Sequence, residues 1–205
     1  MKIKVCGMRD SRNIKAVEEL GIDWMGFVLY APSPRFAACV PSYLPLHTRR
    51  VGVFVDAPRE YILRSIALFG LNTLQLHGHE SPEECCRWHN MGYEVIKAIS
   101  VKASEDLKHA LDYQEGCDYL LFDTKGNGYG GTGKRFNWNY LDDYYGRVPF
   151  LLSGGITVES LQAITAISHP QMVGIDLNSG FETAPGLKDT DCLYKFIEQI
   201  KSISL

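Results

Sequence analysis

Short apolar segments typical of β-strands alternate along the whole chain with segments typical of helices. The predicted strands cover residues 3–5, 24–29, 51–55, 73–76, 93–99, 119–122, 150–152 and 172–175, and most are followed by a helical segment. This alternation predicts successive strand–helix units and a parallel sheet. Eight such units in 205 residues predict an α/β fold, a (β/α)8 TIM barrel that forms one domain over residues 1–205. A doubly wound open sheet is the structural alternative, but the chain is short for eight units of it.

One unit departs from this alternation. Residues 36–49 contain Pro41 and Pro45, and proline interrupts a helix because it lacks the backbone N–H and clashes with the preceding turn. We therefore predict that the strand at 24–29 is not followed by a full helix. By contrast, residues 58–69 form a helical segment that Gly70 can end in a left-handed conformation.

Polar or small residues stand at or just after the ends of most predicted strands. They are Cys6, Arg35, Asp56, His77, Asp123, the pair Gly154-Gly155, and Asp176. The carboxyl ends of the strands of a (β/α)8 barrel meet at one face, where the active sites of this fold lie. The sequence therefore predicts an active site at the C-terminal ends of the strands, with these residues gathered there.

The strand at 119–122 leads into Asp123 and then into a loop with five glycines in residues 126–133. A carboxylate at the rigid end of a strand, below a pliable loop, suits acid–base chemistry under a closing lid. We predict an active-site loop that includes Gly130, Gly131, Thr132 and Gly133. The same stretch is nearly a nucleotide-binding P-loop, but Arg135 stands where the hydroxyl ligand of Mg²⁺ is needed, which argues against NTP hydrolysis.

Two loops of small residues predict a phosphate site. Gly154-Gly155 follows the seventh predicted strand, and Ser179-Gly180 follows the eighth. In (β/α)8 barrels, backbone N–H groups of these two loops commonly bind phosphate. The planar guanidinium of Arg35 suits a substrate carboxylate. Together these features predict an acid–base enzyme that acts on a phosphorylated, anionic small molecule.

Composition and charge narrow the range of partners. The net charge is −3 and the pI is about 6.1, so no overall positive field favours nucleic acid or an anionic membrane. No apolar run reaches the ~20 residues of a membrane span, and the first residues do not resemble a signal peptide. The six cysteines lack the spacing of a disulfide framework or a zinc site. We expect a cytoplasmic enzyme with reduced thiols and no metal or other cofactor, as a monomer or homodimer.

Short motifs occur in order along the whole chain. They are Lys4-Val5-Cys6-Gly7, Ser33-Pro34-Arg35, Leu74-Gln75-Leu76-His77-Gly78, Phe122-Asp123-Thr124, Gly130-Gly131-Thr132-Gly133-Lys134, Ser153-Gly154-Gly155, and Asp176 to Gly180 with Glu182, Pro185-Gly186 and Lys188-Asp189. This combination resembles the phosphoribosylanthranilate isomerase family of tryptophan biosynthesis. Asn178 stands where that family usually has a serine, and the segment before the third strand is shorter than usual.

The resemblance implies an Amadori rearrangement of N-(5-phosphoribosyl)anthranilate to 1-(2-carboxyphenylamino)-1-deoxyribulose 5-phosphate. It implies that Asp123 is the general acid, which protonates the ribose ring oxygen, and that Cys6 is the general base, which removes the C2′ proton. By the same resemblance, Arg35 would bind the anthranilate carboxylate, and His77 and Asp176 would bind and orient the substrate. The ordinary pKa of a thiol is about 8.5, so we expect a modest shift toward the thiolate to suffice near neutral pH.

Two alternatives remain open from the sequence. One is another phosphate-binding barrel enzyme of the indole-glycerol-phosphate synthase type, which would need catalytic lysines at strand ends, and only Lys97 is a candidate. The other is a catalytically silent barrel that acts as a binding subunit. The presence of both Cys6 and Asp123 argues against it.

Overall fold

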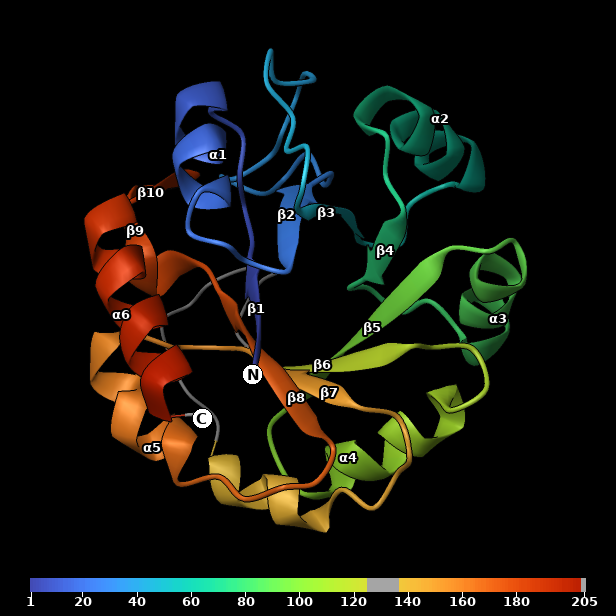
Figure 1. The fold of residues 1–205 in the computed structure, drawn as a ribbon. Coiled ribbons are helices and arrows are strands. Elements are labelled where there is room, and N and C mark those ends of the chain that lie inside the picture. Colours follow the sequence, from blue (N-terminus) through green and yellow to red (C-terminus); the bar gives the residue numbers. More distant parts are fainter. Residues whose placement is uncertain (125–136, 204–205) are drawn as a thin grey trace.

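The computed structural model of the chain describes residues 1–124 and 137–203. Eight parallel strands form a closed barrel in chain order (Figure 1). The strands are β1 (Lys2–Val5), β2 (Trp24–Val28), β3 (Arg49–Phe54), β4 (Thr73–Leu76), β5 (Glu94–Val101), β6 (Tyr119–Thr124), β7 (Phe150–Leu152) and β8 (Met172–Leu177). The predicted barrel is confirmed, and the open sheet is wrong because β1 pairs with β8.

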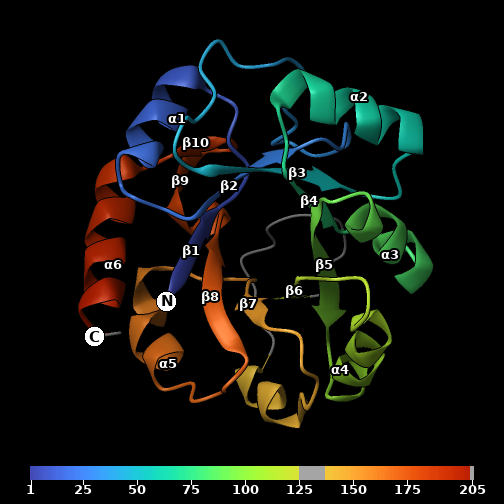
Figure 2. The ribbon, with the colours of Figure 1, turned by 45° about the vertical axis from the view of Figure 1, so that its right-hand side comes forward.

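Helices surround the barrel on its outside (Figure 1). The α-helices are α1 (Ser11–Glu18), α2 (Arg59–Phe69), α3 (Pro82–Asn90), α4 (Glu105–His109), α5 (Leu161–Thr165) and α6 (Thr190–Ile203), and the 3-10 helices are η1 (Ala110–Tyr113), η2 (Trp138–Asp143), η3 (Val158–Ser160) and η4 (Ser179–Phe181). A hairpin of β9 (Glu182–Ala184) and β10 (Leu187–Lys188) follows β8 and lies beside α1 (Figure 2). The sequence patterns do not predict this hairpin.

Capping residues begin or end several helices. The carboxylate of Asp10 accepts a hydrogen bond from the backbone N–H of Asn13 at 2.9 Å and so caps α1. Gly70 ends α2 with a left-handed φ of 60°. The hydroxyl of Ser81 caps α3 by accepting from the backbone N–H of Glu84 at 3.3 Å. These caps fix the connections that return the chain to the barrel.

The segment between β2 and β3 contains no helix, as predicted. The carboxylate of Glu18 in α1 anchors it instead, because it accepts hydrogen bonds from the hydroxyl of Tyr43 at 2.5 Å and the backbone N–H of His47 at 2.6 Å. Burial acts to raise the pKa of Glu18, but these hydrogen bonds lower it overall. An ionised side chain thus holds this irregular segment against the barrel.

Side chains alternate along each strand, so the core has two layers. Ile3 and Val5 belong to the larger layer, which the barrel shares with the helices. Cys6, Val53 and Leu121 belong to a smaller cluster that fills the barrel interior. This alternation decides which side chains reach the carboxyl ends of the strands from the inside.

Candidate active site

The carboxyl ends of the strands surround a cavity. The predicted site residues that line it are Cys6, Arg35, His77, Asp123, Gly154, Gly155, Asp176 and Ser179. Gly180 does not line the cavity, but its backbone packs against the carbonyl oxygen of Ile156 in the loop after β7. Asp56 does not join it, since its carboxylate pairs with His79 at 3.0 Å and its side chain is 47% exposed. The predicted active-site loop at residues 130–133 lies outside the described residues.

A buried charged cluster lies at the base of this cavity. Lys4 and Cys6 share one side of β1, because side chains alternate along a strand. Lys4 is fully buried, and its Nζ lies 2.9 Å from Oδ1 of Asp176, its register partner on β8. The ammonium also interacts electrostatically with the thiol of Cys6. Gly26 on β2 leaves room for that sulfur, since a Cβ there would lie 2.7 Å from Sγ.

Burial dominates the electrostatics of this cluster. It raises the pKa of the Cys6 thiol, and the opposing effect of Lys4 does not cancel it. Burial acts to lower the pKa of Lys4, but the carboxylate of Asp176 raises it overall, so the ammonium stays charged. The expected shift of Cys6 toward the thiolate is therefore wrong, because a buried thiol loses its proton at a desolvation cost.

Asp123 lies near the carboxyl end of β6, beside His77, which follows β4. The backbone N–H of Thr124 donates to Oδ1 of Asp123 at 2.8 Å, and Nε2 of His77 lies 3.4 Å from Oδ2. The amide nitrogen of Gln75 lies 2.9 Å from Nδ1 of His77. When Gln75 donates this bond, the imidazole hydrogen is on Nε2 and faces Asp123. Gln75 and His77 thus orient a donor toward the Asp123 carboxyl group.

The loops after β7 and β8 form one wall of the cavity. Gly154 and Gly155 have φ values of 84° and 66°, which glycine adopts without strain. A Cβ at Gly154 would lie 2.7 Å from Oδ1 of Asp123, and a Cβ at Gly180 would collide with the carbonyl oxygen of Ile156. The glycines therefore allow these loops to pack against β6 and against each other.

The histidines and cysteines near α3 do not form a metal site. His79 pairs with Asp56, and His89 lies 3.3 Å from Asp118. All six cysteines are free thiols. Over residues 1–124 and 137–203, no group of three or more His, Cys, Asp or Glu side chains is arranged to hold a metal ion.

Comparison with known proteins identifies the family. Residues 3–199 match the family model described as N-(5'phosphoribosyl)anthranilate (PRA) isomerase. The chain belongs to this family. It is 51% identical over 201 residues to the N-(5'-phosphoribosyl)anthranilate isomerase of Phocaeicola vulgatus, and the alignment covers 98% of both chains.

Solved structures agree with this assignment. The phosphoribosyl anthranilate isomerase of Thermus thermophilus is 30% identical with a TM-score of 0.84, over 99% of this chain and 100% of that one. A phosphoribosyl anthranilate isomerase solved in complex with reduced 1-(o-carboxyphenylamino)-1-deoxyribulose 5-phosphate is 32% identical with a TM-score of 0.79, over 98% of this chain and 99% of that one. The resemblance inferred from the motifs is thereby confirmed.

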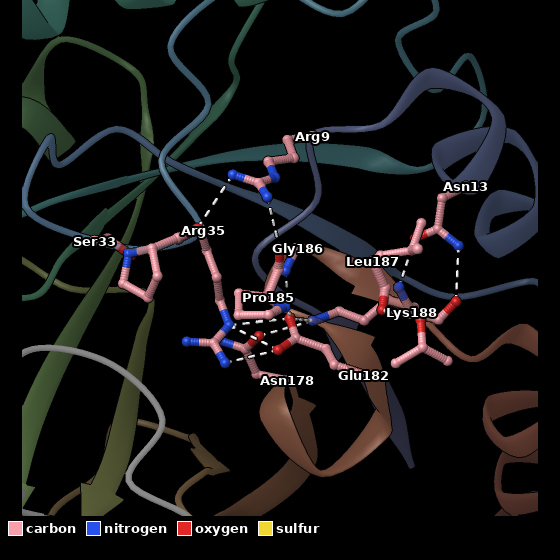
Figure 3. Close-up of polar contacts among 12 residues, drawn as sticks. Arg9, Asn13, Ser33, Arg35, Asn178, Glu182, Pro185, Gly186, Leu187 and Lys188 are labelled. Atoms are coloured by element: carbon pink, nitrogen blue, oxygen red, sulfur yellow. Dashed lines mark hydrogen bonds and ion pairs between the residues drawn. The ribbon is translucent and has the colours of Figure 1, made fainter.

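In this member of the isomerase family, the guanidinium of Arg35 is paired with a buried carboxylate, that of Glu182. Its Nε lies 3.0 Å from both carboxylate oxygens of Glu182, and its Nη2 lies 2.6 Å from Oε2 (Figure 3). Nζ of Lys188 lies 2.6 Å from Oε1 of Glu182 and 2.7 Å from Oδ1 of Asn178. Burial acts to raise the pKa of Glu182, but its bonds to Arg35 and Lys188 lower it overall.

Sequence reasoning did not assign Lys4, Glu182 or Lys188 to the site. A signal for Lys4 existed, since it stands two residues before Cys6 in a short strand and must face the same side. Glu182 and Lys188 occur in the family motifs. However, nothing in their spacing indicates contact with Arg35, which is 147 residues from Glu182 in the sequence.

Proposed function

We propose that the chain is a phosphoribosylanthranilate isomerase that converts N-(5'-phosphoribosyl)anthranilate to 1-(2-carboxyphenylamino)-1-deoxyribulose 5-phosphate, a step of tryptophan biosynthesis. The observation that carries this proposal is that Cys6, directly after β1, and Asp123 from β6 line one cavity, in a chain that belongs to the isomerase family. The cavity can hold a ribose between a proton donor and a proton acceptor.

The reaction is an isomerisation with no net change of atoms, in which Asp123 gives one proton to the substrate and Cys6 takes one from it. Asp123 gives its proton to the ring oxygen while the C1′–O bond breaks, and the lone pair of the anthranilate nitrogen forms a protonated Schiff base. The Cys6 thiolate then removes the C2′ proton, and the C–H electrons form the enolamine and neutralise the nitrogen. The enolamine tautomerises to the ketone when C1′ gains a proton and the C2′ hydroxyl loses one. Desolvation of the thiolate increases its basicity, which favours the second transfer.

The ends of the substrate are anions, and the cavity offers a donor group for each. Gly154, Gly155 and Ser179 belong to the loops after β7 and β8 and present backbone donors suited to the phosphate. Arg35 is suited to the aryl carboxylate. Asp176, fixed by Lys4, is suited to a ribose hydroxyl, and His77 is suited to orienting Asp123.

The cellular setting remains a prediction. None of the helices in the described ranges is both long enough and apolar enough to cross a membrane. We propose a cytoplasmic enzyme, which is compatible with six free thiols, and we keep monomer or homodimer as the expected state.

The turnover of phosphoribosylanthranilate, followed by the loss of its fluorescence in a coupled assay, tests the function directly. No turnover by the folded protein would favour the catalytically silent barrel.

The indole-glycerol-phosphate synthase alternative lacks support from its only candidate lysine. Nζ of Lys97 donates to the carbonyl oxygens of Leu76 and Gly78 and pairs with Glu80 at 3.0 Å.

The phosphate loops give a first prediction. Gly155→Asp should raise KM at least ~100-fold, because like charges in contact cost several kcal/mol. Gly92→Asp is the matched control, since Gly92 also has positive φ but a Cβ added there would meet no heavy atom within 4 Å. Inorganic phosphate should compete with substrate in the parent enzyme. A Gly155→Asp enzyme with unchanged KM would contradict the assignment of these loops to the phosphate.

A second prediction concerns the buried lysine beside the thiol. Lys4→Met removes the cation that lowers the Cys6 pKa, so that pKa should rise further. At a fixed pH below the Cys6 pKa, the fraction of thiolate and kcat/KM should both fall several-fold. The pH dependence of Cys6 alkylation by iodoacetamide, read by mass spectrometry, measures the shift without turnover.

Lys97→Met is the control, because Lys97 is another buried lysine in an ion pair, with Glu80, and lies outside the cavity lining. It should destabilise the fold without moving the alkylation profile of Cys6. An unchanged profile in folded Lys4→Met would show that Lys4 has no part in setting the reactivity of the thiol.

A further inference from the structure

The carboxylate of Glu182 is the centre of a buried polar network at the side of the cavity. Its side chain is 4% exposed, and it accepts from Nε and Nη2 of Arg35, from Nζ of Lys188 and from the backbone N–H of Gly186 at 3.1 Å. A carboxylate has about four acceptor positions, so Glu182 is fully occupied. It has no capacity left for a substrate hydroxyl, and its contacts are all within the protein.

This network determines how Arg35 can meet a ligand. A guanidinium is planar, and a carboxylate that takes its Nε edge fixes the plane of the whole group. The other terminal nitrogen, Nη1, makes no hydrogen bond to the residues that the structure describes, and it points away from Glu182 (Figure 3). Arg35 lines the cavity, so this edge is the part of the guanidinium that remains for a ligand.

The hairpin that carries Glu182 is itself held in place from outside the cavity. Asn13 in α1 donates to the carbonyl oxygen of Lys188 at 2.9 Å and accepts from its N–H at 2.8 Å. Arg9 joins the carbonyl oxygens of Pro34 and Pro185 at 3.1 and 2.8 Å (Figure 3). The loop before Arg35 and the turn after Glu182 are therefore joined through one side chain.

The charges of this network also favour the binding of an anion beside Arg35. Arg35 and Lys188 are two cations around the one carboxylate of Glu182. Ionised, the three groups carry one unit of positive charge in a buried setting. A substrate carboxylate at the free edge of Arg35 would neutralise it.

We propose that Glu182 is a positioning residue, which orients Arg35 so that its free edge receives the aryl carboxylate of the substrate. This inference rests on the proposed function, because the aryl carboxylate belongs to that substrate. Glu182 does not touch the reacting atoms. Its effect should therefore appear in the binding of a carboxylated substrate and not in the proton transfers.

The test compares two substrates that differ only in this group, N-(5-phosphoribosyl)anthranilate and N-(5-phosphoribosyl)aniline. Glu182→Gln keeps the size but places an amide against the donors of Arg35 and Lys188. For the anthranilate substrate, kcat/KM should fall about ten- to hundred-fold, mainly through KM, as expected for lost charged hydrogen bonds. For the aniline substrate, consumption followed by chromatography should match that of the parent enzyme.

Glu80→Gln is the matched control, because Glu80 is another buried carboxylate paired with a lysine, at 3.0 Å from Lys97. Glu80→Gln should lower kcat/KM for both substrates by the same factor or change neither value. If Glu182→Gln does not fold, as judged by circular dichroism, Glu182→Asp keeps the charge, shortens the side chain by one methylene, and should show a smaller loss of the same selectivity.

Arg35→Ala separates failure of this inference from failure of the proposed function. Suppose that Arg35→Ala loses activity only on the anthranilate substrate, whereas the Glu182 variants lose activity equally on both substrates. Glu182 would then have only a structural role, and the positioning role would be overturned. If Arg35→Ala loses activity equally on both substrates, the carboxylate site is wrong and the positioning role fails with it. If the parent enzyme converts neither substrate, the proposed function itself is wrong.

Discussion

Asp123→Asn is expected to lower kcat/KM by roughly 10²–10⁴-fold, the usual contribution of a general acid. Asparagine keeps the shape, and its carbonyl oxygen can still accept from the N–H of Thr124, as Oδ1 of Asp123 does at 2.8 Å. It has no proton of suitable acidity for the ribose ring oxygen. Ring opening should stall while KM changes little, because the anion sites are untouched.

The measurement is kcat/KM against pH for the parent and variant enzymes, with matched circular dichroism spectra. The falling limb of the profile should disappear with Asp123. Asp56→Asn is the control, since Asp56 also follows a strand but pairs with His79 outside the cavity. Near-parent turnover in folded Asp123→Asn would show that the proton comes from another group, and the mechanism would have to be abandoned.

The barrel and the gathering of the site residues could be predicted because both depend on local patterns. Apolar strand segments and capping residues such as Asp10 and Ser81 act over a few positions of the chain. The closure of a parallel barrel then places every strand end on one face. His77 and Asp123 are 46 positions apart in the sequence, yet this rule places both on one face, where Nε2 of His77 lies 3.4 Å from Oδ2 of Asp123.

The supporting charges could not be predicted in the same way. Lys4 and Asp176 are 172 residues apart, and Arg35 and Glu182 are 147 residues apart. A buried charge is tolerated only with a partner, and the choice of that partner depends on side-chain placement in three dimensions. For the same reason the sequence predicts the wrong direction for the shift of the Cys6 pKa. Burial raises this pKa more than the neighbouring cation, Lys4, lowers it.

Cys6→Ser is the second change for which we expect a large loss, again roughly 10²–10⁴-fold in kcat/KM. Serine has nearly the same size and keeps the position between Lys4 and the cavity. A hydroxyl is a much weaker acid than a thiol, so almost none of it is ionised at any pH at which the protein is folded. The C2′ proton would then have no base, and the step after ring opening should stop.

The pH profile distinguishes Cys6 from the other ionisable groups of the cavity as the base. The base works only when deprotonated, and burial raises the pKa of Cys6. The rising limb of kcat/KM in the parent enzyme should therefore vanish in Cys6→Ser. Alkylation of Cys6 follows the thiolate alone, so it should inactivate the parent mainly on the alkaline side of an ordinary thiol. Cys39→Ser, which alters an exposed thiol, should change neither the rising limb nor the alkylation. A rising limb that survives in folded Cys6→Ser would assign the base to another residue of the cavity.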